Sequence, residues 1–196
     1  MSAPLDDPAL DLLFREARTR NGWSDDPVTD ADIKAIYDLY KMGPTAVNMQ
    51  PARVVWIKSP EAKARLEPHL SAGNKAKTMK APVTAVIGYD MDFNEHLPRT
   101  FPNAPGAKDW FPDPAAKQVA AFRNGTLQAG YLIMAARALG FDCGPMSGFD
   151  NDGVDKEFFA GTNIRSNFIV AIGHGTDENL YPRNPRLAFQ DANTIL

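Results

Sequence analysis

Apolar residues recur at helical spacing near the start of the chain. Residues 7–18 open with Asp and Pro, a helix N-cap followed by proline at the first helical position, and then carry Leu and Ala at helical spacing. Residues 29–32 form a capping-box variant, with Thr first and Asp fourth, before a second apolar pattern that Gly43-Pro44 stops. We therefore expect two helices before residue 43, the first ending near Arg18.

Three runs rich in Val, Ile and aromatic residues lack this spacing and predict buried strands. They cover residues 53–57, 83–89 and 166–173, and a shorter strand is expected within 141–148. Helices fall between the strands: one begins after Ser59 and breaks near Pro68, and two others cover about 71–80 and 152–160. Strands do not alternate strictly with helices, so the order predicts an α+β fold with a central mixed β-sheet flanked by helices.

The longest helical pattern runs from Pro114 to Leu139 and is apolar on nearly every face. Gly125 and Gly130 weaken it and Asn124 could cap a new start, so either one long helix or two helices fit the sequence. A helix that is apolar all round is buried, either at the centre of the domain or at a dimer interface.

Residues 90–114 hold five prolines and several aromatic side chains without any periodicity. A loop this long is uncommon in a compact domain, and it fits either a lid over a site or an Ω-loop packed on its own aromatics. Residues 174–196 are expected to form a mostly irregular C-terminal arm. The length of 196 residues predicts a single domain over 1–196.

The composition excludes several classes of partner. A net charge of −3 lacks the basic footprint of a nucleic-acid-binding protein, and no apolar run reaches the roughly 20 residues of a membrane span. The acidic N-terminus has no apolar core of a signal peptide, so a cytoplasmic protein without membrane or nucleic-acid partners is expected. Cys143, the sole cysteine, is expected to be a buried small apolar residue. The three histidines have no metal-ligand spacing, so no metal site is predicted.

The candidate chemistry begins in the turn between the second predicted helix and the first strand, residues 43–51. Thr45 offers a hydroxyl, and Asn48 and Gln50 each offer a donor and an acceptor, which suits the polar edge of a flat heteroaromatic ring. Prolines at both ends, Pro44 among them, stiffen the turn and lower the entropic cost of ordering it around a ligand.

Three further segments carry groups that a ligand could use. Residues 18–23 (Arg-Thr-Arg-Asn-Gly-Trp) and 181–187 (Tyr-Pro-Arg-Asn-Pro-Arg-Leu) each hold two arginines, whose planar groups suit a phosphate. Residues 144–149 (Gly-Pro-Met-Ser-Gly-Phe) form a tight turn with glycine near each end.

In this order, the four segments resemble the FMN-dependent nitroreductase family over nearly the whole chain. The resemblance implies a homodimer with two FMN molecules at its interface. It also implies ping-pong hydride transfer from NADH or NADPH through flavin N5 to a small-molecule substrate, with no catalytic side chain. No G-x-G-x-x-G follows a strand, so a separate nicotinamide-binding unit is not expected.

The resemblance also assigns positions around the cofactor. The main chain of Gly148 would face N5, which only a glycine allows at such close approach. Ser147 stands where many members have Glu, a departure that bears on specificity. Arg186 matches the terminal phosphate arginine best, and whether Arg18 or Arg20 contacts the phosphate stays open. The full set of implied cofactor-binding residues is Arg18, Thr19, Arg20, Pro44, Thr45, Asn48, Gln50, Pro145, Met146, Ser147, Gly148, Arg183 and Arg186.

Three runs resemble one branch of the family most closely: GPTAVNMQPAR, AFRNGTLQAGYLIMAARALGFDCGPMSGFD and YPRNPRL. This branch includes malonic semialdehyde reductase of pyrimidine breakdown, so the resemblance implies reduction of 3-oxopropanoate to 3-hydroxypropanoate. Three alternatives stay open. They are a general nitroarene or quinone reductase, a flavin enzyme that fragments or rearranges its ligand, and a non-catalytic flavin carrier or sensor.

Overall fold

The computed structural model describes residues 3–196, and a four-stranded sheet lies at its centre. The strands in order across the sheet are β2 (Ala52–Ile57), β3 (Val83–Asp90), β5 (Ile164–Gly173) and β4 (Asp142–Met146). These are the four strands that the sequence predicts. The β-branched and aromatic side chains of β2, β3 and β5 suit a pleated sheet.

Every neighbouring pair in this sheet is antiparallel, so the predicted mixed sheet is wrong. The helices between β2 and β3 favoured a crossover to a parallel strand. Instead they return the chain to the end of the sheet that it left, because Ile57 at the end of β2 pairs with Thr84 near the start of β3. Within residues 3–196, the one parallel pairing is an isolated bridge between Thr19 and Cys143.

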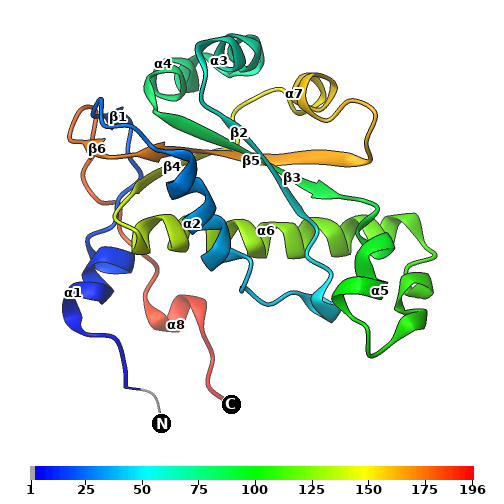
Figure 1. Cartoon of the computed structure of the whole chain (residues 1–196). Coiled ribbons are helices and arrows are strands. Elements are labelled where there is room, and N and C mark those ends of the chain that lie inside the picture. Colours follow the sequence, from blue (N-terminus) through cyan, green and yellow to red (C-terminus); the bar gives the residue numbers. More distant parts are fainter. Residues whose placement is uncertain (1–2) are drawn as a thin grey trace.

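Helices cover both faces of the sheet (Figure 1). On one side lie α3 (Pro60–Leu66), α4 (Ala72–Lys80) and α7 (Asn151–Phe158), and on the other lie α2 (Asp30–Tyr40) and α6 (Pro114–Ala138). Side chains alternate along β3, so Ala85 and Ile87 join the core on the α2–α6 side while Val86 joins the core on the opposite side.

The long pattern after residue 114 forms one helix, α6, which runs along the sheet (Figure 1). Asp113 caps it, because its carboxylate accepts hydrogen bonds from the amides of Ala115 and Ala116. Leu132 and Ala136 are buried against the sheet. The opposite face of α6 leaves large apolar side chains exposed, namely Val119, Phe122, Leu127 and Tyr131.

The predicted start of the second helix is confirmed, and the predicted first helix is too long. Thr29 and Asp32 form the capping box of α2. The first helix consists of α1 (Asp7–Leu10) and a π-helix over Asp11–Arg15, and Asp6 caps it instead of Asp7. It ends before residue 18 because the following segment extends to the sheet edge, where the Arg20 amide donates to the Cys143 carbonyl at 3.1 Å.

Residues 90–114 fold into short turns around their own aromatic side chains. They include a 3₁₀ turn (Phe93–His96), α5 (Leu97–Thr100) and a second 3₁₀ turn (Pro105–Trp110). Phe93 is fully buried and packs edge to face against Phe111 with ring centroids 4.9 Å apart. This packing matches the Ω-loop alternative, and a lid role for the region stays a prediction.

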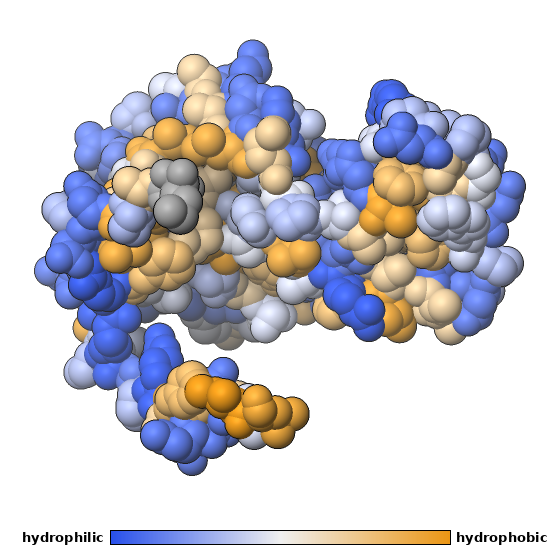
Figure 2. Space-filling view, turned by 90° about the horizontal axis from the view of Figure 1, so that it is seen from below, coloured by the Kyte–Doolittle hydropathy of each residue, from blue (hydrophilic) through white to orange (hydrophobic). Residues whose placement is uncertain are grey.

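The C-terminal arm is largely exposed. After β6 (Gly175–Thr176), which pairs with β1 (Gly22–Trp23), the chain runs through largely exposed residues to α8 (Phe189–Ala192). Figure 2 shows the arm standing apart from the main body, with apolar side chains on its surface. No helix in the described part of the chain is long and apolar enough to cross a membrane.

Candidate active site

The turn at residues 43–51, which we call the ring loop, has an unusual backbone. It follows α2 and contains a 3₁₀ turn over Ala46–Asn48. Val47, Asn48 and Gln50 adopt positive φ values of 47°, 51° and 43°. Such conformations cost non-glycine residues about 1–3 kcal/mol each and persist only where surrounding contacts hold them. Three of the four residues from 47 to 50 adopt such a conformation, which makes the loop a candidate for a functional role.

Two buried amides on α6 hold the ring loop in place. The Asn124 side-chain oxygen accepts from the Ala46 amide at 2.9 Å, and the Gln128 side-chain oxygen accepts from the Ala52 amide at 2.9 Å. Both side chains are buried and lie one helical turn apart. This role was not predicted from the sequence. The signal available was a pair of amide residues, four apart, on a helix that is otherwise largely apolar.

The polar side chains of the ring loop bond to one another. The Thr45 hydroxyl accepts from the Gln50 amide at 3.2 Å, and the Gln50 side chain donates to the Asn48 side-chain oxygen at 2.9 Å. Asn48 also donates to the Thr100 carbonyl at 2.7 Å, which ties the loop to residues 90–114. Pro44 is exposed at the start of the loop. The arrangement presents hydroxyl and amide groups on one short segment.

A pocket of about 280 Å³ lies between the N-terminal segment and the C-terminal arm. Its lining includes Arg18, Thr19, Arg183 and Arg186, four of the residues that the family resemblance implies for cofactor binding. Arg18 donates to the Tyr181 carbonyl, and Arg183 donates to the Ala17 carbonyl at 3.1 Å. These bonds join the two segments that form the pocket.

This pocket, which we call the arginine pocket, has a fourth arginine and no carboxylate among its lining residues. Arg137, in the last turn of α6, lines it and donates to the Leu13 carbonyl at 3.1 Å. Four guanidinium groups without a neutralising acid make a strongly positive cavity that suits a phosphate dianion. Arg137 was not predicted from the sequence, because a basic residue in the last turn of a helix is ordinary there.

Arg20 lies outside this pocket. Its terminal nitrogen pairs with Asp177 at 2.7 Å, and its Nε lies 3.5 Å from the Asp142 carboxylate. Arg20 is thus engaged by two acids beside the edge strand β4. Of the two arginines whose roles stayed open, Arg18 is the one that faces the arginine pocket.

The end of β4 and the turn after it place Met146 and Gly148 against α4, where they contact Thr78 and Asn74. Met146 is buried, Ser147 is exposed, and Pro145 is half-buried within the strand. The Gly148 carbonyl accepts from the Ser71 amide at 3.1 Å and from the Asn74 side chain at 2.9 Å. A Cβ at this position would lie 2.6 Å from the Asn74 side-chain nitrogen, so this fold itself favours glycine there.

The ring loop and the arginine pocket lie at different points along α6. Gln128 holds the loop and Arg137 lines the pocket, nine residues further on, which corresponds to roughly 14 Å along the helix axis. The single helix α6 therefore sets the spacing between the ring loop and the arginine pocket.

A family model described as the nitroreductase family matches residues 15–174. The chain belongs to the nitroreductase family. A protein of Caulobacter sp. strain K31, provisionally named NADH dehydrogenase/NAD(P)H nitroreductase, is 63% identical over 194 residues, which are 99% of this chain and 100% of that protein. The similarly named HadB of Ralstonia pickettii is 54% identical over 190 residues, covering 95% of this chain and 97% of that protein. The predicted family is confirmed.

Solved structures of nitroreductases share the fold. A nitroreductase of Exiguobacterium sibiricum 255-15, crystallised in complex with FMN, superposes with a TM-score of 0.87 at 20% identity. It covers 100% of this chain and 99% of that one. The CLA-ER enone reductase of gut-bacterial fatty acid saturation superposes with a TM-score of 0.83 at 16% identity, covering 98% of this chain and 100% of that one.

Cys143 is not a reactive group of this nitroreductase. It is fully buried in the core between the sheet and α6. Burial raises the pKa of its thiol to about 12; the charge of Arg137 opposes this rise and that of Asp142 adds to it. The thiolate that a nucleophilic cysteine needs is therefore scarce near neutral pH. The prediction of a buried apolar role for Cys143 is confirmed.

Proposed function

We propose that this chain is an FMN-dependent oxidoreductase that passes hydride from NADH or NADPH to a small electrophilic substrate in the cytoplasm. The observation that carries the proposal is the arginine pocket, in which four guanidinium groups and Thr19 meet without an opposing carboxylate. A phosphate dianion balances such a cavity better than any neutral ligand. The FMN in the Exiguobacterium relative and the names of the Caulobacter and Ralstonia relatives support the same chemistry.

Residues of this chain have separate tasks in the proposed complex. Arg18, Arg137, Arg183 and Arg186 hold the phosphate. Thr45, Asn48 and Gln50 orient the ring by hydrogen bonds to its polar edge. Gly148, with Pro145, Met146 and Ser147 beside it, is assigned to the region of N5. When bound, FMN supplies the ring that takes up hydride from the nicotinamide and passes it to the second substrate.

The protein's contribution is position rather than acid–base chemistry. The nicotinamide donor and the acceptor substrate would use the same face of the flavin ring in turn. That face must therefore be open while the polar edge of the ring is held in place. The left-handed backbone of the ring loop and its anchors on α6 provide such fixing before a ligand arrives. No side chain of the site needs to act as a nucleophile.

We further propose a homodimer with two flavins at its interface. Two apolar surfaces support it. One is the exposed face of α6, with Val119, Phe122 and Tyr131, and the other is the C-terminal arm, where Leu187 and Phe189 stand exposed. Surfaces of this kind on a water-soluble chain mark contacts with another chain.

The proposed natural substrate is 3-oxopropanoate, which the enzyme would reduce to 3-hydroxypropanoate. The motifs that resemble the malonic semialdehyde reductase branch support this choice. A second candidate is a general reductase of nitroarenes and quinones, which the nitroreductase names of the relatives favour. Both candidates share the flavin and the nicotinamide, and they differ only in the final acceptor.

Purification followed by anaerobic titration tests the proposal. We expect a yellow protein that releases FMN on denaturation, loses its visible absorption when NADH or NADPH is added, and regains it with a suitable acceptor. A panel of 3-oxopropanoate, quinones and nitroarenes ranks the acceptors. Colourless protein that excess FMN does not restore would overturn the proposal. Bound flavin that neither nicotinamide reduces would favour a carrier.

A further inference from the structure

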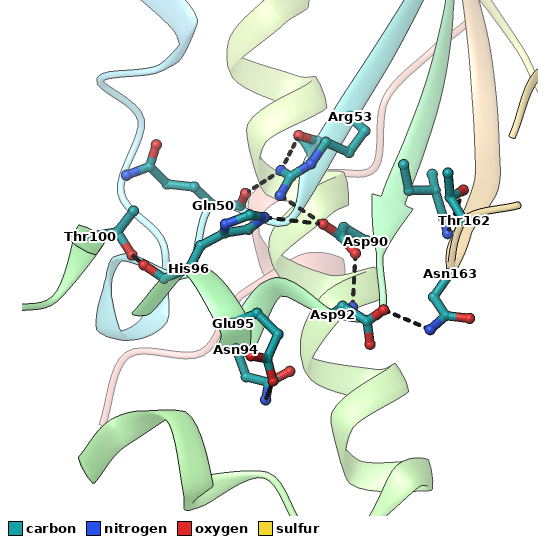
Figure 3. Close-up of polar contacts among 12 residues, drawn as sticks. Gln50, Arg53, Asp90, Asp92, Asn94, Glu95, His96, Thr100, Thr162 and Asn163 are labelled. Atoms are coloured by element: carbon teal, nitrogen blue, oxygen red, sulfur yellow. Dashed lines mark hydrogen bonds and ion pairs between the residues drawn. The ribbon is translucent and has the colours of Figure 1, made fainter. Parts of the chain in front are cut away.

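Arg53 connects the ring loop to the sheet through one guanidinium group (Figure 3). It stands at the start of β2. One terminal nitrogen donates to the carbonyls of Gln50 and Ala52, each at 2.9 Å, and the other pairs with the Asp90 carboxylate at 2.7 Å. Its three partners lie in different directions, which suits the planar fork of arginine and not a point charge.

Asp90 anchors this fork from the end of β3. Its side chain is only 11% exposed, and a buried carboxylate is costly unless it is paired and hydrogen-bonded. Both of its oxygens have partners, since Oδ2 meets Arg53 and Oδ1 accepts from the Asp92 amide at 2.8 Å. The Asp90 amide also donates to the Pro51 carbonyl at 2.9 Å. The pair thus joins the loop end to β3 at two points.

Two neighbouring residues, Asp92 and His96, lie beside the Arg53–Asp90 pair, and neither bonds to the Gln50 main chain in the way that Arg53 does. Asp92 accepts from the Asn163 side chain at 2.6 Å, which fixes the turn after β3 (Figure 3). The His96 Nε2 atom lies 3.7 Å from the same Asp90 oxygen that binds Arg53, beyond hydrogen-bonding distance. Arg53 is therefore the group that holds both the Asp90 carboxylate and the Gln50 main chain.

Gln50 is the residue that needs such support. Its φ of 43° is unfavourable for a side chain with a Cβ, and its carbonyl is the group that Arg53 holds. Its side chain donates to Asn48, so its orientation is fixed at two points, one on the main chain and one on the side chain. Released from Arg53, Gln50 would relax toward the extended backbone that a residue before proline prefers, and this would turn its side-chain amide away from Asn48.

We infer that Arg53 and Asp90 are positioning residues that set the orientation of the Gln50 amide toward the flavin ring edge. The inference rests on the proposed function, in which Gln50 contacts that edge. The pair acts through Gln50 and touches neither flavin nor substrate. A role in folding alone would change stability but would leave the spectrum and the reduction rate of bound flavin unaltered.

Arg53→Lys is the principal variant, because it keeps the charge and loses the fork. Arg65→Lys is the matched control, since Arg65 pairs with Glu157 on the surface of α3, away from the ring loop. At saturating FMN and NADH, we expect Arg53→Lys to slow flavin reduction roughly tenfold and to shift the visible flavin band, the scale of one lost charge-assisted hydrogen bond. Arg65→Lys should match the wild type in both readouts.

A double-mutant cycle with Gln50→Ala decides between positioning and folding. In the Gln50→Ala background, Arg53→Lys should have no further effect on the reduction rate or the spectrum, while any loss of thermal stability should persist. An equal slowing in both backgrounds, or no difference between Arg53→Lys and Arg65→Lys, would overturn the inference. If Arg53→Lys does not fold, Asp90→Asn enters the same cycle with the same expectations.

The wild-type arm separates this inference from the proposed function. The inference alone is overturned if wild-type protein binds FMN and is reduced by NADH, but Arg53→Lys slows reduction equally in the wild-type and Gln50→Ala backgrounds. Wild-type protein that cannot be loaded with FMN defeats the proposed function, and the inference falls with it.

Discussion

The two ends of the proposed cofactor site are built in opposite ways. The ring loop is held by buried amides of α6 and by the Arg53–Asp90 pair, so its strained backbone is fixed by the fold. The arginine pocket depends on the C-terminal arm, where Tyr181 is 74% exposed and the arginines bond mainly to main-chain carbonyls. The ring end is therefore preformed, while the phosphate end depends on a segment with little packing of its own.

This difference predicts separate consequences for binding and folding. Groups at the phosphate end have their effect when ligand binds, because they have no buried partner to lose in the free protein. Groups at the ring end act on the folded chain itself, because removing them leaves partly buried main-chain donors without acceptors.

The largest expected effect is on FMN affinity at the phosphate end. Arg186→Ala should weaken FMN by roughly 2–4 kcal/mol, the range for truncating one partner of a charged pair. Riboflavin, which lacks the phosphate, should bind the variant and the wild type alike. Isothermal titration of apo-protein with both ligands measures the difference. Arg15→Ala is the control, because Arg15 pairs with Asp7 and Asp11 on the surface. Equal losses for FMN and riboflavin would contradict a phosphate contact.

The next effect is on stability at the ring end. Gln128→Ala leaves the Ala52 amide without its acceptor and should lower the free energy of unfolding by about 1–3 kcal/mol. Gln118→Ala, on the exposed side of the same helix, should change it by less than about 0.5 kcal/mol. Urea denaturation of the two apo-variants gives both values. A Gln128 variant as stable as the Gln118 variant would mean that the loop is not held from α6.

Sequence alone predicted much of the fold and proposed the residues of the candidate site. Local signals were sufficient for the Thr29–Asp32 capping box, the four strands and the Thr45–Asn48–Gln50 loop, because caps, periodicity and donor groups are local properties. Strand direction was not local, and the sheet is antiparallel because the connection after β2 returns to the same end.

The missed residues share one physical cause. Asn124, Gln128, Arg137 and the Arg53–Asp90 pair act through contacts between segments that are distant in sequence. An amide inside a helix or an arginine in its last turn looks ordinary until the loop or arm that it meets is known. The first helix ended early for the same reason, since pairing with the edge strand overrides its helical spacing.

A smaller effect concerns Gly148, where the fold and the proposed ring both favour glycine. Gly148→Ala brings a Cβ within 2.6 Å of the Asn74 side chain and should cost about 1 kcal/mol of stability. Asn74→Ala removes both the clash and the Asn74–Gly148 hydrogen bond, so adding Gly148→Ala to Asn74→Ala should not lower the melting temperature further. If the Gly148 main chain lies beside N5, flavin reduction by NADH stays slow in the double variant. Full recovery of the rate would mean that Gly148 serves only the contact with Asn74.

The smallest effect tests whether the arginine pocket has one rigid side. Thr19 and Arg20 pair with Cys143 of β4, so the N-terminal wall of the pocket is backed by the core while the arm is not.

Burial raises the pKa of the Cys143 thiol to about 12 from 9.0. The unfolded chain therefore loses this proton at lower pH than the folded chain, and the thiol's contribution to stability is lost as pH rises from about 9 to 12.

Thiol labelling reads the same property near neutral pH. At pH 8, a disulfide reagent such as DTNB should modify Cys143 far more slowly in native protein than in urea. Native protein treated with the reagent should keep its rate of flavin reduction. FMN added to apo-protein should leave this slow rate almost unaltered, because the wall is rigid before ligand binds. By contrast, FMN should protect the arm from proteolysis after Arg183 or Arg186. If FMN slowed labelling of Cys143 as much as cleavage of the arm, both walls of the pocket would form with the ligand. The contrast would then lie between the ring loop and the whole pocket.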